Sequence, residues 1–153
     1  MNILRRKTLA LFCSKKCPGN LILKTYDLAR NLRDTGVTVI SGFHSPVEKE
    51  CLNILLKGRQ PIIVCPARSL EGIRLPCIWK KKIEEGKMLL LSSFPSHIRR
   101  ATAETAVKRN IMAAAIADEV CFIHIEPGGS LEELKKMVTV WVKEIFIVTD
   151  KKV

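Results

Sequence analysis

Short apolar runs alternate with longer amphipathic segments along the chain. The apolar runs cover residues 8–13, 37–40, 61–65, 88–91, 119–123 and 145–148. Helical periodicity marks the segments between them, at 21–35, 46–57, 77–85, 108–118 and 130–143. Continuous apolar runs are typical of strands buried on both faces, and helices between strands join them in parallel. The pattern therefore predicts an α/β fold with three layers and a doubly wound, mainly parallel six-stranded sheet.

Turn and cap residues mark the ends of these elements. Gly36 and Gly58 follow two of the helical segments and suit helix C-termini. Pro46 suits the first position of a helix. Ser130, with Glu133 three residues later, matches a capping box, which predicts that a helix begins there.

The length and composition favour a single folded domain over residues 1–153. Hydrophobic residues make up 47% of the 153 residues, which is enough to build a core. We find no internal repeat, low-complexity tract or linker. No apolar segment is long enough to span a bilayer and no secretory signal is recognisable, so we expect no membrane association and a cytoplasmic location.

The cysteine pattern favours free thiols. Cys13 and Cys17 are separated by three residues, so they do not form a redox CxxC motif. No second Cys/His pair lies at zinc-finger spacing, and we expect no metal site. The other four lie in apolar or helical contexts, where we expect small buried hydrophobes: Cys51, Cys65, Cys77 and Cys121.

The charge balance favours a polyanionic partner. Lys and Arg number 26 against 15 Asp and Glu, which gives a formal net charge of +11. A basic protein attracts nucleic acids, nucleotides or acidic surfaces. The same excess of charge also serves solubility alone.

Small and cationic residues gather after three of the predicted strands. In a doubly wound sheet the ligand lies beyond the carboxyl ends of the strands, where the strand order reverses. The glycine turn before residue 130 opens a helix, whose free amides suit a phosphate or another anion, and Arg109 is placed to aim its charged fork at the same point. The three loops hold Ser14, Lys15 and Lys16, then Ser41 and Gly42, then Gly128, Gly129 and Ser130.

Several motifs lie at the ends of the predicted elements. Ser41-Gly42 closes the second strand, and a proline-containing loop follows residues 61–65. Phe94-Pro95 follows the fourth strand, and Lys108-Arg109-Asn110 is followed by a small-residue helix and Ala117-Asp118-Glu119. Together these motifs resemble the DNA-processing protein A (DprA/Smf) family of the SLOG superfamily, and the Lys108-Arg109-Asn110 segment is the most specific match.

The resemblance implies a Rossmann-like domain that binds single-stranded DNA in a basic groove. It also implies self-association and transfer of the DNA to a recombinase, and it implies no cofactor. The expected nucleic-acid contacts, besides the small residues of the three loops, are Lys15, Lys16, Arg99, Arg100, Lys108, Arg109 and Asn110.

The chain departs from the usual family pattern in places. Cys13-Ser14-Lys15 stands where the family usually has Gly-Ser-Arg, and Phe43 stands where it has a second glycine. The flanking helical and winged-helix domains of the family are not represented in this sequence.

The glycine turn also resembles the LOG-type nucleotide phosphoribohydrolases of the same superfamily. Residues 127–133 are similar to their Pro-Gly-Gly turn, with about two residues fewer. Under this alternative Arg109 would hold the phosphate of a nucleoside 5′-monophosphate and Glu133 would act at the ribose. Glu133 also has the simpler explanation of a helix cap, and a nucleotide sensor without turnover would use the same loops.

Overall fold

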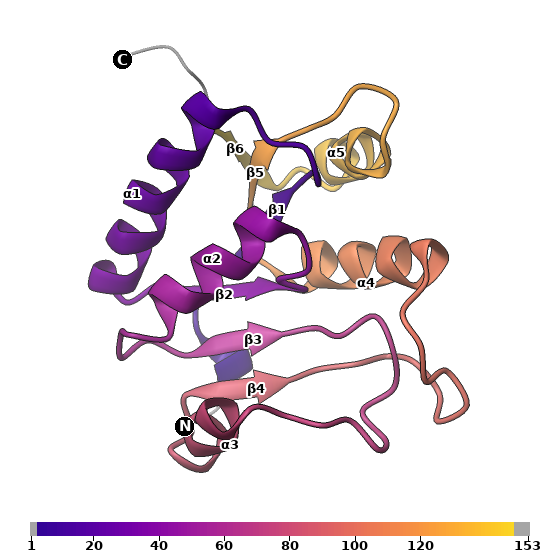
Figure 1. Cartoon of the computed structure of the whole chain (residues 1–153). Coiled ribbons are helices and arrows are strands. Elements are labelled where there is room, and N and C mark those ends of the chain that lie inside the picture. Colours follow the sequence, from indigo (N-terminus) through magenta and orange to yellow (C-terminus); the bar gives the residue numbers. More distant parts are fainter. Residues whose placement is uncertain (1–2, 149–153) are drawn as a thin grey trace.

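The computed structural model describes residues 3–148, which form one six-stranded sheet with helices on both faces (Figure 1). The strands are β1 (Thr8–Cys13), β2 (Thr38–Ser41), β3 (Ile62–Val64), β4 (Met88–Leu90), β5 (Glu119–His124) and β6 (Glu144–Ile147). The helices are the 3-10 turn η1 (Ile3–Arg5), α1 (Gly19–Thr35), α2 (Pro46–Leu55), α3 (Cys77–Glu84), α4 (Ala103–Ile116) and α5 (Ser130–Val140). All neighbouring strands pair in parallel, so the predicted α/β class is confirmed.

The two faces of the sheet bury separate apolar cores. Leu9 and Leu11 of β1 pack in a cluster with residues of α1 and α2. Ala10 and Phe12, which alternate with them, pack with residues of α4 and α5. Successive side chains of a strand point to opposite faces, so the continuous apolar run of β1 serves both cores.

The strand order reverses next to β1. The sheet runs β4-β3-β2-β1-β5-β6, so the chain builds outward from β1 to β4 and then returns to the other side of β1. α4 is the connection that makes this return (Figure 1). The loops after β1 and β5 therefore diverge onto opposite faces, and a crevice opens between them at the carboxyl end of the sheet.

Three sequence-based expectations are wrong. α5 begins at Ser130 as predicted, but its N-cap is Gly129 and no side chain caps it, so Ser130 and Glu133 form no capping box. α5 also ends at Val140, before the predicted end at 143, and Val142 has a φ of 59°. Cys77 is exposed at the start of α3, whereas the other three cysteines expected in the core are buried.

No helix within residues 3–148 is long and apolar enough to cross a membrane.

Candidate functional site

A cavity of about 540 Å³ lies at the reversal of the strand order, between the ends of β1 and β5 and helices α2, α4 and α5. Its walls come from five separate segments of the chain. Six of the residues singled out in the sequence meet there: Ser14, Lys15, Arg109, Asn110, Gly129 and Ser130.

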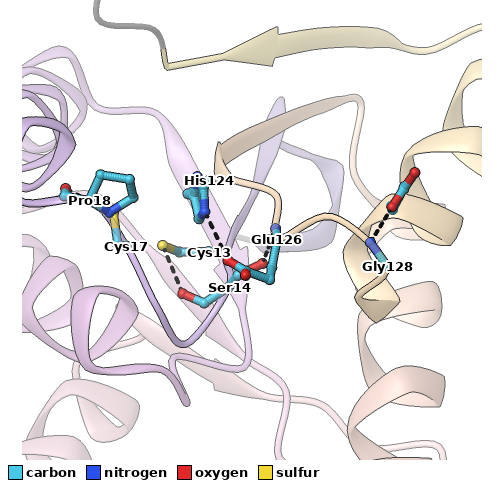
Figure 2. Close-up of polar contacts among 8 residues, drawn as sticks. Cys13, Ser14, Cys17, Pro18, His124, Glu126 and Gly128 are labelled. Carbon is cyan, nitrogen blue, oxygen red and sulfur yellow. Dashed lines mark hydrogen bonds and ion pairs between the residues drawn. The ribbon is translucent and has the colours of Figure 1, made fainter.

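Ser14 joins the end of β1 to the loop after β5. Its backbone N–H donates to the His124 carbonyl at 3.0 Å. Its hydroxyl accepts the Glu126 backbone N–H at 2.9 Å, and the Glu126 carboxylate lies 3.3 Å from His124 Nε2 (Figure 2). The first and third of the predicted loops are therefore fixed to each other at the edge of the cavity.

Ser41 and Gly42 shape the structure beneath the cavity and do not line it. Ser41 is fully buried, its hydroxyl donates to the Leu11 carbonyl at 2.7 Å, and it accepts the Phe43 N–H at 3.2 Å. Gly42 leaves room for the guanidinium of Arg109, which would collide with any Cβ at that position.

Arg109 is a buried part of this wall, with only 4% of its surface exposed. Its Nε donates to Asn110 Oδ1 at 2.7 Å and its Nη1 donates to the Cys65 carbonyl at 3.2 Å. Burial lowers the pKa of Arg109, while the charge of Glu48 opposes that effect. Two of the five N–H donors of the fork are thus held by the protein, and its positive charge lies in the wall of the cavity.

Glu48 is a residue of the cavity that the sequence motifs do not single out. It is 6% exposed, and its carboxylate accepts backbone N–H groups from Cys13 and from the loop that precedes α2. Burial raises the pKa of Glu48, and the three backbone hydrogen bonds and Arg109 act against that rise. The sequence does contain a signal that could have identified Glu48, because Ser45 and Glu48 have the spacing of a capping box. The structure contains this capping box.

Two backbone N–H groups of the glycine turn are already hydrogen-bonded within the protein. Gly128 has a φ of 78°, and its N–H donates to the carboxylate of Glu132 at 2.6 Å (Figure 2). The Gly129 N–H donates to the Glu126 carbonyl at 3.0 Å. Ser130 and Leu131 follow in the first turn of α5 and line the cavity, and amides in a first turn have no acceptor within their helix. These amides are the donors of the turn that suit an anion.

The cavity carries both signs of charge. Lys15 and Arg109 contribute positive charge to its walls, and Glu48 and Glu126 contribute negative charge. His44 also lines it, and burial, followed by the charge of Arg109, lowers the pKa of His44. The expected basic character therefore does not come from this cavity.

Three other predicted cations line an adjacent trough of about 830 Å³, which is formed by the segment between β4 and α4 and by the first turns of α4. Arg99 and Lys108 make exposed ion pairs with Glu71 at 3.4 Å and with Glu104 at 3.2 Å. Thr102, the N-cap of α4, lines both the trough and the cavity. The residues of the trough include Phe94, His97, Arg99, Arg100 and Lys108.

The remaining predicted residues lie elsewhere. Lys16 and Gly128 line neither space. Glu133 lines a small groove of about 120 Å³ between α4 and α5 and lies 3.2 Å from Lys136. Arg109 and Glu133 thus line different spaces. Among residues 3–148, no three His, Cys, Asp or Glu side chains are grouped as a metal site would need.

The comparison with solved structures shows the fold. The sequence matches no family model and no curated protein. A structure of DNA processing protein A from Helicobacter pylori, described for its single-stranded DNA binding mode, aligns with 95% of this chain at a TM-score of 0.74 and 19% identity. DNA processing protein A (DprA) from Streptococcus pneumoniae aligns with 95% at a TM-score of 0.75 and 13% identity. The chain has the DprA fold.

This confirms the predicted resemblance at the level of fold. The chain covers 66% of the H. pylori DprA chain and 51% of the S. pneumoniae chain. A molybdenum cofactor binding protein from Rippkaea orientalis also aligns with 94% of this chain, with a TM-score of 0.62, 12% identity and coverage of 76% of that protein. Proteins described for quite different ligands thus share this fold, and function has to be argued from the site.

Proposed function

We propose that this protein binds single-stranded DNA through the trough and the adjoining cavity. The observation that carries the proposal is that the two spaces are adjacent and share Thr102 as a lining residue. A strand whose phosphates lie along the trough would pass Thr102 to place one nucleotide in the cavity. The likeness to DprA, whose H. pylori structure was described for its single-stranded DNA binding mode, supports this choice of polymer.

The trough would supply most of the affinity. Arg99, Arg100 and Lys108 are exposed. Arg99 and Lys108 would exchange their exposed carboxylate partners for phosphates. Neutralising phosphates releases counterions, and this contribution does not depend on base sequence. Phe94 is the aromatic residue of the trough and would stack one base, whereas strong single-strand binders usually offer several such platforms.

The cavity would hold one nucleotide more specifically. Lys15 and the first amides of α5 suit its phosphate.

Binding of a fluorescent oligothymidylate, measured by anisotropy at several salt concentrations, tests the proposal. We expect the logarithm of the binding constant to fall linearly with the logarithm of salt concentration. Arg100→Gln with Lys108→Gln should reduce that slope by about 1 to 1.5, since each single-strand phosphate contact contributes roughly 0.7. Lys57→Gln, an exposed change just after α2, is the control and should leave the slope unchanged. A folded protein that binds no oligonucleotide at low salt would refute the proposal.

A second candidate is binding of a free mononucleotide in the cavity, as a sensor or as a LOG-like phosphoribohydrolase. The balanced charge and the volume of about 540 Å³ favour a small ligand over a polymer at this point. A thermal shift panel of nucleoside monophosphates, followed by a search for released base, distinguishes these outcomes, since a bound ligand raises the apparent stability.

We also infer from the resemblance that the protein forms one domain over residues 1–153, self-associates, works in the cytoplasm and transfers the strand to a recombinase. Sedimentation at several protein concentrations, with and without oligonucleotide, tests self-association first. A single species with the mass of one chain under all conditions would contradict it.

A further inference from the structure

Glu48 is a buried carboxylate that makes three hydrogen bonds to backbone amides. Its Oε2 accepts the Cys13 N–H at 2.8 Å. Its Oε1 accepts the His44 N–H at 2.9 Å and the Ser45 N–H at 3.3 Å. A capping box needs only the contact with Ser45, so the other two contacts exceed what the start of α2 requires.

The contact with Cys13 connects Glu48 to the far side of the cavity. Cys13 is the last residue of β1, and the next residue, Ser14, accepts the Glu126 N–H after β5. A chain of direct contacts therefore runs from α2 through the end of β1 to the glycine turn. Lys15, the cation of the cavity that follows Ser14, is carried by the same segment.

Burial of the ionised Glu48 carboxylate is unfavourable in free energy. An ionised carboxylate out of water is unfavourable unless donors and a positive charge offset the loss of hydration. Here the backbone donors and the charge of Arg109 from α4 do so only in part, because burial still raises the pKa of Glu48. A costly acid at the wall of a cavity points to a role in the site as well as in the fold.

We propose that Glu48 is a positioning residue, which holds the loops after β1 and β2 in the one arrangement that presents Lys15, Ser14 and the Arg109 charge to a ligand. The effect on affinity rests on the proposed function, whereas the holding of the loops does not. Glu48 is not placed in contact with the ligand phosphate, because its two oxygens are already occupied by backbone donors.

The charged and titratable groups around Glu48 define what a titration would report. Arg109 faces it from α4, the Cys13 thiol from β1 and the Cys51 thiol from its own helix. Burial raises the pKa of the Cys51 thiol to about 12 and raises that of Cys13 as well, so both stay neutral in the working range. The remaining neighbour is His44, whose pKa is lowered by burial. A lowered histidine pKa and a raised glutamate pKa can overlap, so the proton is assigned to Glu48 by the Glu48→Gln variant, which keeps His44.

The first experiment needs no ligand. We expect the backbone amide signals of Cys13, His44 and Ser45 to shift together, with one midpoint above the ordinary glutamate value of 4.5, when the wild-type protein is titrated by NMR. Separate midpoints, or no shift, would overturn the proposal. Glu48→Gln should abolish the common titration and speed hydrogen exchange of the Cys13 amide about tenfold or more, as expected for losing a charged hydrogen bond.

The second experiment uses the sign of the change in affinity. Glu48→Gln and Glu126→Gln each remove one negative charge from the same cavity, so charge alone should strengthen binding of an anionic oligonucleotide in both. A positioning role predicts instead that Glu48→Gln weakens it about tenfold or more. Glu126 is half-exposed and its backbone contact with Ser14 survives the substitution, so this variant should bind as well as the wild type or better.

Equal or tighter binding by the folded Glu48→Gln variant would overturn the positioning role in the site. If the wild-type protein binds no oligonucleotide or nucleotide, the proposed function fails, and the common amide titration alone decides whether Glu48 holds the two loops.

Discussion

The guanidinium of Arg109 occupies the space in which residue 42 would carry a side chain. Nη1, Nε and the central carbon of the Arg109 fork all lie too close to an added Cβ at Gly42 for the two to coexist. The same fork reaches the carbonyl of Cys65 at the end of β3. Arg109 thus lies across the ends of β2 and β3, and the glycine is needed because of the arginine rather than because of its own backbone.

Gly42→Ala tests this relationship through stability. The added methyl group must displace a buried charged side chain, so we expect a loss of about 1–3 kcal/mol in the free energy of unfolding, measured by urea denaturation. Gly19→Ala is the matched control, because a Cβ added at Gly19 would meet no atom within 4 Å and the change should stay within roughly 0.5 kcal/mol. Equal effects of the two substitutions would show that Arg109 moves aside without cost.

Arg109→Lys separates the charge of Arg109 from its shape. A lysine keeps the charge but lacks the planar fork that serves Cys65 and Asn110 together. We expect oligonucleotide affinity to fall about tenfold, since the charge is no longer held in place and a buried carbonyl loses its donor. Arg100→Lys, an exposed change in the trough, should reduce affinity by less than about threefold because phosphate neutralisation needs only the charge.

The sheet could be predicted from the sequence because each strand in its centre is buried on both faces. Apolar runs such as residues 8–13 have no competing explanation when helical segments separate them, and parallel pairing then follows from the crossover helices. Helix ends are less well determined. The spacing of Ser130 and Glu133 predicts a cap, but Glu132 bonds to Gly128 instead, and only the conformation of the turn decides which glutamate reaches back.

From the sequence, only those site residues could be predicted whose positions follow from the ends of the strands. Ser14, Arg109 and Gly129 meet because parallel strands end at one edge of the sheet. The Cys13 contact of Glu48 joins residues 35 apart, and a local cap motif does not reveal it. Net charge likewise does not show on which face the cations lie, so the separation of Arg99, Arg100 and Lys108 from the cavity could be seen only in the structure.

Glu132→Ala should strengthen anion binding at the glycine turn. The substitution frees the Gly128 N–H and removes a negative charge from the first turn of α5. We expect nucleoside monophosphate affinity, measured by calorimetry, to rise about threefold to tenfold. Glu133→Ala removes the same charge one residue further on, but that carboxylate faces Lys136, so its effect should be smaller. Identical gains in both variants would mean that charge alone, and not the freed amide, is responsible.

Cys77 should be the fastest cysteine to react with a thiol reagent at pH 8. It is exposed, whereas burial raises the pKa of Cys51, Cys65 and Cys121 to about 12, which keeps those thiols protonated and covered. A chromogenic disulfide should therefore show a fast phase that Cys77→Ser removes, while all six thiols react in denaturant. A fast phase that survives the substitution would place a second accessible thiol in the native protein.

The pH dependence of stability should show whether burial or hydrogen bonding dominates at Glu48. Burial raises the pKa of the folded-state carboxyl above the unfolded value of about 4.5, so the folded protein binds this proton more tightly than the unfolded chain does. The contribution of Glu48 to the free energy of unfolding is therefore greatest below about pH 4.5 and falls as the pH rises towards the folded-state pKa. Subtracting urea-denaturation values for Glu48→Gln from those of the wild type at each pH removes the contribution of the other carboxylates, and the difference should decrease as the pH rises above about 4.5. A difference that increases with pH would mean that the three amide donors and Arg109 outweigh the loss of hydration.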